Sequence, residues 1–248
     1  MKKFKKLIPA LCMLLVSAVL MGTSTFAWFS MNKTATVDGL AVKANAESIY
    51  LLISNTQAST TAEAIQAENG GKGFTTVSET VANPELKPAA LATKATKADV
   101  KETTITDYSS VNSWYTADAI DASASAVKED SEKKLTTFDG YVLTYTYRLT
   151  LAKGSTATTN LKVGTCTFEA AGGKTIDAAR VLVVCGENAE EFKPGTTAGT
   201  KTLATDISDS TVVEVKVYVY IDGNDTTIYT NNVENLDQAN ITLTFVVD

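Results

Sequence analysis

The chain contains no histidine, and it has only two arginines, Arg148 and Arg180. Because histidine is the usual base of hydrolase triads and a common ligand of catalytic zinc, most enzymes of those classes are excluded. Few arginines also mean few bidentate phosphate clamps. The chain lacks a glycine-rich phosphate loop and any alternation of strand with helix, which excludes the doubly wound nucleotide-binding folds. We therefore predict no catalytic residues and no cofactor, and we expect a protein that is not an enzyme.

Cysteine is scarce as well. Cys12 lies in the apolar N-terminal run, so Cys166 and Cys185 are the two thiols of the remaining chain. Two cysteines in an exported protein are able to form a disulfide. Both also lie in apolar, strand-like surroundings, where an unpaired cysteine serves as a small core residue. The sequence is compatible with either alternative.

The first 27 residues have the order of a secretory signal peptide. Lysines from Lys2 to Lys6 precede an apolar run, 7–20, and small residues follow up to Thr25 and Ala27. This order predicts cleavage between Ala27 and Trp28, and therefore a secreted mature chain, 28–248. The alternative is an uncleaved membrane anchor, since a span needs roughly 20 apolar residues. The polar residues before Thr25 interrupt the run and favour cleavage, so membrane contact is expected only through the leader.

Acidic residues outnumber basic ones. Loss of the leader removes four lysines and no acid, so the formal charge changes from −6 to −10. Such a chain has little cationic surface with which to displace the counterions of a phosphate backbone, so we do not expect nucleic acid as a partner. Its length fits one elaborate domain.

Apolar residues at every second position dominate the C-terminal half. The segments 141–151, 213–221 and 241–247 each follow this pattern, which predicts strands with one buried face. The phase of the alternation slips at Gly164, which indicates a β-bulge. The uninterrupted apolar run 181–184 predicts a strand that is covered on both faces. Further strands are predicted at 34–44 and 48–54.

The region 55–138 has a different character. Thr60 and Glu63 have the spacing of a capping box, and Asn69 precedes two glycines, so a short helix is predicted between them. An alanine-rich stretch within 114–135 is either helical or a polar loop. We expect an all-β chain with a minor helical insertion: one antiparallel β-sandwich, 28–248, with an elaboration at about 55–138.

The densest acidic cluster, formed by Asp222, Asn224 and Asp225, has two interpretations. Its oxygen ligands suit calcium, a hard cation. Asp-Gly between two β-prone segments is also a strong hairpin signal, which we favour. The adjacent Glu190 and Glu191 are a poor pair of catalytic carboxylates, because neighbouring residues on a strand point to opposite faces.

Aromatic residues suggest two kinds of contact. Tyr108, Trp114 and Tyr115 are candidate contacts for a carbohydrate or host ligand, or else the core of the 55–138 region. Trp28 and Phe29 would begin the mature chain, where exposed aromatic rings need a cover. They pack either on their own domain or on a neighbour whose sheet the first strand completes.

The residues around the predicted cleavage site resemble a known family. Gly22 to Ser30 is similar to the signal segment of a group of exported proteins from Gram-positive bacteria, which a SipW-type signal peptidase cuts. This group includes TasA and the camelysin-like proteins. The segments 31–34 and 220–225 are similar to clostridial members. The resemblance covers about half of the chain and does not include 55–138.

This resemblance implies a jelly-roll sandwich that assembles into extracellular fibres, in which the mature N-terminal segment donates a strand to the next subunit. The implied partners are a second copy of the chain, head to tail, the signal peptidase, and an anchoring or accessory matrix protein. The implied location is the extracellular matrix or cell surface of a Gram-positive bacterium. Some relatives have been called metalloproteases, an activity that does not suit a chain without histidine. The donor positions would be Trp28, Phe29, Met31, Val37, Leu40 and Val42.

The sequence leaves two further functions open. One is a monomeric cell-surface binding module that uses the 55–138 region to meet a carbohydrate or host ligand. The other is a secreted hydrolase, for which no site is defined.

Overall fold

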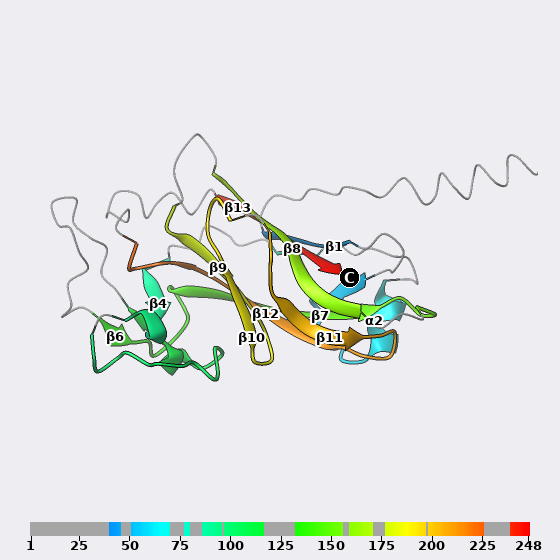
Figure 1. Ribbon diagram of the computed structural model, residues 1–248, viewed down its shortest axis with the longest axis horizontal. Coiled ribbons are helices and arrows are strands. Elements are labelled where there is room, and N and C mark those ends of the chain that lie inside the picture. Colours follow the sequence, from blue (N-terminus) through cyan, green and yellow to red (C-terminus); the bar gives the residue numbers. More distant parts are fainter. Residues whose placement is uncertain are drawn as a thin grey trace, which may run out of the picture. The chain divides into compact units, whose positions relative to one another are not determined.

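The computed structural model describes ten segments, all within the predicted mature chain: 40–45, 51–69, 77–79, 86–95, 97–116, 132–155, 159–170, 177–196, 198–225 and 239–248. These segments contain three β-sheets and one α-helix (Figure 1). The predicted all-β sandwich is therefore confirmed.

Sheet A has five strands and one exceptional ladder. Its strand order is β11 (Thr202–Ile207), β8 (Thr159–Ala170), β13 (Ala239–Val247), β1 (Leu40–Asn45) and β3 (Val77–Glu79). Its other ladders are antiparallel, but β1 runs parallel to β13. The predicted antiparallel sandwich thus contains one parallel ladder among its described strands. No hairpin joins β1 to β13, so no turn fixes their relative direction.

Sheet B also has five strands, and all of its ladders are antiparallel. The order is β10 (Asn188–Phe192), β9 (Ala179–Cys185), β12 (Val213–Ile221), β7 (Val142–Leu151) and β2 (Leu51–Ser54). From β7 onward the chain passes repeatedly between the two sheets, which gives the sandwich its jelly-roll-like order.

The main core lies between sheets A and B, and the predicted alternation places its residues. Tyr147 and Leu149 of β7, Val217 of β12, and Leu243 and Phe245 of β13 are at most 1% exposed and belong to one apolar cluster. Burial of this kind stabilises the fold by about 25 cal/mol for each Å² of apolar surface removed from water.

The bulge predicted at Gly164 is confirmed by the register of β8 against β13. Thr165 pairs with Thr244, but the next pair joins Val163 to Phe245, so Gly164 is the extra residue. This insertion explains why the apolar positions change phase along β8: Leu161 and Val163 enter the core before it, and Cys166 enters the same core after it.

The outer face of sheet B is covered by two separate elements. Sheet C consists of β4 (Ala89–Leu91), β5 (Trp114–Thr116) and β6 (Lys133–Lys134), with the 3-10 helices η1 (Ala92–Lys94) and η2 (Val111–Ser113) beside its strands. It packs on Leu182, Val184, Tyr218 and Tyr220. The other element is the helix α2 (Ala62–Glu68), which packs on Leu52 of β2 through Ile65. As predicted for 181–184, every residue of β9 is buried.

The predicted short helix is confirmed, with its N-cap one residue later than expected. The cap is Thr61, whose hydroxyl accepts from the amide of Ala64 at 3.2 Å, and Asn69 is the C-cap. Glu68 then ties the helix to the preceding loop, because its carboxylate accepts hydrogen bonds from the hydroxyls of Ser54, Thr56 and Ser59.

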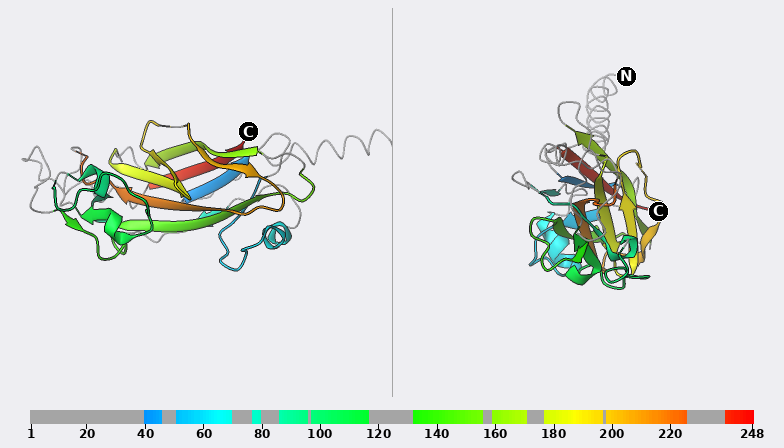
Figure 2. Two further views of the ribbon diagram at one scale, coloured as in Figure 1. Left: turned by 60° about the horizontal axis from the view of Figure 1, so that its bottom comes forward. Right: turned by 90° about the vertical axis from the view of Figure 1, so that its left-hand side faces the viewer.

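The described parts of the 55–138 region lie in three places. Helix α2 covers sheet B near β2, β3 joins sheet A, and sheet C covers the other end of β7 and β12 (Figure 2). Residues 117–131, with most of the alanine-rich stretch, lie outside the described segments, so its predicted helix or loop stays a prediction.

Gly199 provides a test of the close contact between the segment before β11 and β8. A Cβ atom at this position would lie 2.3 Å from the carbonyl oxygen of Val163 and 2.8 Å from its Cβ. Since backbone has little room to move, Gly199→Ala should lower the free energy of unfolding by about 1–3 kcal/mol in urea denaturation. Thr205→Ala, at an exposed position of β11, is the control and should change it little. Equal stability of the two variants would contradict this contact.

Candidate functional site

Strand β1 contains two of the predicted donor positions, Leu40 and Val42. It lies between β13, with which five residues pair in parallel, and β3, with which three residues pair antiparallel. Val42 pairs with Leu243 on one side and with Val77 on the other. Leu243 itself is completely buried in the main core. Strand β1 is therefore an internal strand whose backbone is paired on both sides.

The other residues predicted for cleavage and strand donation lie outside the described residues, so those roles stay predictions. Within the part of the chain that the structure describes, no helix has the length and apolarity needed to cross a bilayer. The predicted cleavage and donor residues that lie outside the described residues are Thr25, Ala27, Trp28, Phe29, Met31 and Val37.

The opposite side of the sandwich, formed by β10 and β11, is closed by side chains. The amide of Asn188 donates to the carbonyl of Leu203 at 3.0 Å, and the carboxylate of Glu190 accepts from the backbone N–H of Thr200 at 2.7 Å. Strand β11 is also irregular, with two register shifts and a backbone φ of 56° at Asp206. Such features make a strand edge a poor template for another strand.

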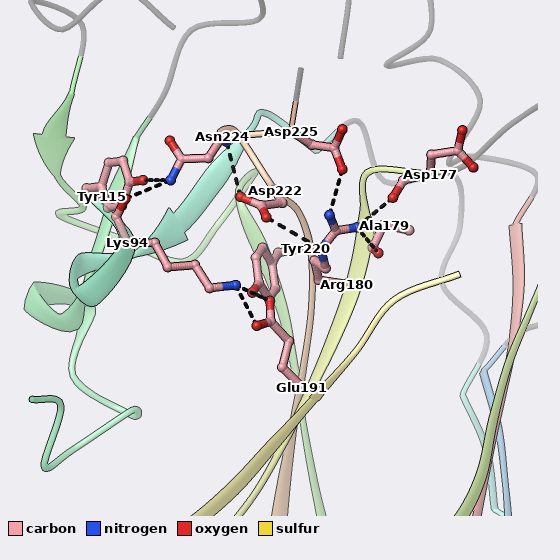
Figure 3. Close-up of polar contacts among 10 residues, drawn as sticks. All are labelled: Lys94, Tyr115, Asp177, Ala179, Arg180, Glu191, Tyr220, Asp222, Asn224 and Asp225. Atoms are coloured by element: carbon pink, nitrogen blue, oxygen red, sulfur yellow. Dashed lines mark hydrogen bonds and ion pairs between the residues drawn. The ribbon is translucent and has the colours of Figure 1, made fainter. Parts of the chain in front are cut away.

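A turn is present at Asp222, where the N–H of Asp225 donates to the carbonyl of Asp222, but the second strand of the predicted hairpin lies outside the described residues. The carboxylates of the turn face a guanidinium group instead of an open cation site. Arg180 lies with its Nε atom 3.4 Å from Asp222 Oδ2 and its Nη2 atom 2.6 Å from Asp225 Oδ2 (Figure 3). Its Nη1 atom donates to two backbone carbonyls. Burial raises the pKa of Asp222, and the nearby guanidinium opposes that rise.

The calcium interpretation is corrected by these contacts. Asn224 points its side-chain amide away from the carboxylates and donates to the carbonyl of Lys94 at 2.9 Å and to the hydroxyl of Tyr115. Within the described segments, no group of three or more histidine, cysteine or acidic residues could hold a metal ion. The cluster of Asp222, Asn224 and Asp225 is a turn that joins β12 to sheet C.

Glu191 forms a second polar contact between sheets B and C. Its carboxylate accepts from Lys94 Nζ at 2.5 Å and from the hydroxyl of Tyr220 at 2.6 Å (Figure 3). Burial, together with the Glu191 charge, raises the pKa of Tyr220 well above its usual value, so the phenol stays protonated and donates. The neighbouring Glu190 binds Thr200 on the other side of β10, as the alternation of strand side chains predicts.

Trp114 and Tyr115 are completely buried, which corrects their assignment as ligand contacts. The Trp114 ring meets Tyr220 edge to face, with centroids 4.9 Å apart, and its indole N–H donates to the carbonyl of Tyr108 at 3.0 Å. Tyr108 is half-buried beside the same cluster. The aromatic residues belong to the core, as the alternative interpretation stated, and that core extends onto sheet B.

Cys166 and Cys185 are both free and buried, on β8 and β9 respectively. Burial raises the pKa of the Cys166 thiol to about 12. The disulfide alternative is therefore not formed in the structure, and both thiols serve as core residues.

The role of Arg180 was missed at the level of the sequence, although a signal was present. It is one of two arginines in the chain, and it directly precedes an apolar run that predicts a strand buried on both faces. A charged group at such a place requires a partner. The acidic turn 222–225 was the nearest chemically suitable partner in the adjacent strand, but strand order was needed to identify it.

No protein-family model matches this chain, and no curated protein matches it. The candidate functions therefore depend on its own residues and geometry.

Arg180→Met tests the buried ion pair. It should lower the free energy of unfolding by about 3–5 kcal/mol, because it leaves the buried Asp222 carboxylate without its cation. Without the guanidinium the pKa of Asp222 rises further. When the pKa of a carboxyl group is higher in the folded than in the unfolded state, the free energy of unfolding rises as the pH falls through the interval between the two pKa values. The stability lost by Arg180→Met should therefore become smaller in mild acid.

Urea denaturation at neutral and mildly acidic pH measures both effects. Arg148→Met is the matched control, because it breaks the surface ion pair with Glu214, which contributes about 0–1 kcal/mol. Equal losses for the two arginines would contradict the buried pair.

Trp114→Ala should lower the free energy of unfolding by about 3–5 kcal/mol, because it removes the largest side chain between sheets B and C. Thermal unfolding followed by circular dichroism measures the effect. Trp114→Phe keeps an aromatic ring and should lose less. Unchanged stability of Trp114→Ala would indicate that the ring is not part of the core.

Proposed function

We propose that this chain is a secreted structural protein whose mature form polymerises into extracellular fibres, each subunit donating its N-terminal strand to the next. The observation that carries the proposal is the placement of β1. This strand precedes the other described strands in the chain, and its parallel ladder with β13 is made by backbone groups. A backbone ladder depends little on which copy of the chain supplies the strand.

Chain connectivity supports exchange of β1 between copies. Strand β1 ends at Asn45 in sheet A, and β2 begins at Leu51 in sheet B, with five residues between them. Strand β1 is thus the first of the described strands, and its exchange between copies would not change the order of strands β7 to β13. Repeated exchange in one direction does not close on itself, and such a head-to-tail contact produces a filament.

The polar closure of the other edge supports a single direction of growth. Because β10 and β11 present side-chain hydrogen bonds and an irregular backbone, the position beside β13 is the better place for an added strand. Export through the leader, cleavage by a SipW-type signal peptidase, and an anchoring or accessory partner at a Gram-positive surface complete the proposal.

The alternative function, a monomeric surface module that binds a carbohydrate or host ligand through 55–138, has lost its predicted contacts. Trp114 and Tyr115 are buried, and Tyr108 is half-buried beside them. No observation on the described residues favours this alternative or a hydrolase.

Electron microscopy of the mature chain, 28–248, tests the proposal directly. We expect filaments from this chain and none from a chain that begins at Glu47 and therefore lacks β1. The second test uses a variant of the mature chain, 28–248, in which Trp28, Phe29 and Met31 are changed to Ser. This variant keeps β1 and removes the predicted apolar anchors. Filaments from the chain without β1, or only single particles from the mature chain, would overturn strand donation.

Disulfide trapping identifies the strand that is exchanged. Ala41 pairs with Thr242 in the parallel ladder, and neighbouring strands lie about 4.8 Å apart, within the range that a disulfide spans. Ala41→Cys and Thr242→Cys, placed on two differently tagged chains, should form a disulfide between chains in filaments. Chains that are kept monomeric should not crosslink. The native thiols, Cys166 and Cys185, are buried and do not compete.

A further inference from the structure

Strand β3 has an unusual position at the end of sheet A. Among the described strands it pairs with β1 alone, through Val77, Ser78 and Glu79. The order of the sheet places β1 between β13 and β3. The location of β3 in the sheet therefore depends on the presence of β1.

This dependence has a consequence for any strand that takes the place of β1. Paired with β13 alone, it would be the edge strand of the sheet, and one row of its backbone N–H and C=O groups would be exposed. A parallel ladder is also slightly less stable per residue than an antiparallel one. With β3 in place, Leu40, Ala41 and Val42 pair on their second side too, in an antiparallel ladder.

We propose that β3 of an acceptor subunit is a latch, which closes over the β1 strand of a second copy and holds it in the fibre. The proposal rests on the proposed function, because it assigns a further contact to the same strand-donation site. The donated strand first pairs with β13, and β3 then pairs with its free edge. The latch converts an edge strand into an internal strand, so its main effect is on the rate of dissociation.

The size of this effect follows from the number of bonds. A three-residue antiparallel ladder contains about two backbone hydrogen bonds between its strands, and each contributes roughly a factor of five to ten to an equilibrium constant. Loss of the latch should therefore speed the release of a donated strand at least about tenfold, with little change in the first pairing with β13.

Disulfide trapping tests the position of the latch. In the antiparallel register Ala41 lies opposite Ser78. Ala41→Cys on one mature chain and Ser78→Cys on a second, differently tagged chain should form a disulfide between chains in filaments. Thr205→Cys, at an exposed position of β11, replaces Ser78→Cys in the control and should form none.

A kinetic experiment tests what the latch does. Adjacent residues of a strand direct their N–H groups to opposite sides, so one of Val77 and Ser78 donates its backbone N–H toward β1. Proline has no backbone N–H, and the double variant Val77→Pro, Ser78→Pro therefore removes that hydrogen-bond donor in either case. Val77→Ala with Ser78→Ala keeps both N–H groups and is the matched control. After dilution of labelled filaments into unlabelled chain, we expect subunit exchange at least about tenfold faster for the proline variant than for the alanine variant.

The outcomes separate the latch from strand donation itself. A disulfide between chains for Ala41→Cys with Thr242→Cys, but none with Ser78→Cys, would leave donation intact and overturn the latch. Equal exchange rates for the proline and alanine variants would also overturn it. Absence of both disulfides in filaments would overturn the proposed function. A circular dichroism spectrum like that of the parent chain shows that the proline variant is folded.

Discussion

Sheet A depends on the parallel ladder between β1 and β13. This ladder connects the first and the last of the described strands, and it is the connection through which β3 reaches the rest of the sheet. Elsewhere in sheets A and B, antiparallel ladders join the strands. Because no turn links β1 to β13, the ladder has the same geometry whether both strands belong to one chain or to two. The proposed strand donation uses this property, because a ladder that no turn confines to one molecule can be completed by a second copy.

The polar contacts around Arg180 and Glu191 have a different physical role. A buried ion pair gains little net stability over an apolar pair of the same shape, because both charges lose their hydration. Its hydrogen bonds do require particular positions of the partners, and here these lie on β9, on β10, on η1 and in the turn that follows β12. The contact of Lys94 with Glu191 and the hydrogen bonds of Asn224 with Lys94 and Tyr115 thus hold sheet C on the outer face of sheet B.

The fold was predicted from the sequence where one local rule decided the structure. Period-two alternation located β7, β12 and β13, and the change of phase at Gly164 located the bulge. Alternation shows which face of a strand is buried, but it does not identify the neighbouring strand, so the parallel direction of β1 was not predicted. The burial of Trp114 was left open for a related reason. Tyr218 and Tyr220 have polar tips and large apolar rings, and the second covered face of β12 became evident only with sheet C in place.

Charge adds a constraint on how such subunits associate. The predicted mature chain, 28–248, has a formal charge of −10, which opposes non-specific contact between copies over a screening length of about 8 Å at physiological salt. Backbone pairing in a ladder is short-ranged and uses no net charge, so it is weakened less than contact between broad surfaces. Thr165 and Thr244 face each other across β8 and β13 with their hydroxyls hydrogen-bonded, and Thr167 pairs with Thr242, so this part of sheet A carries uncharged polar side chains. In the proposed fibre, repulsion between acidic surfaces together with strand donation would favour growth along a single axis over lateral aggregation.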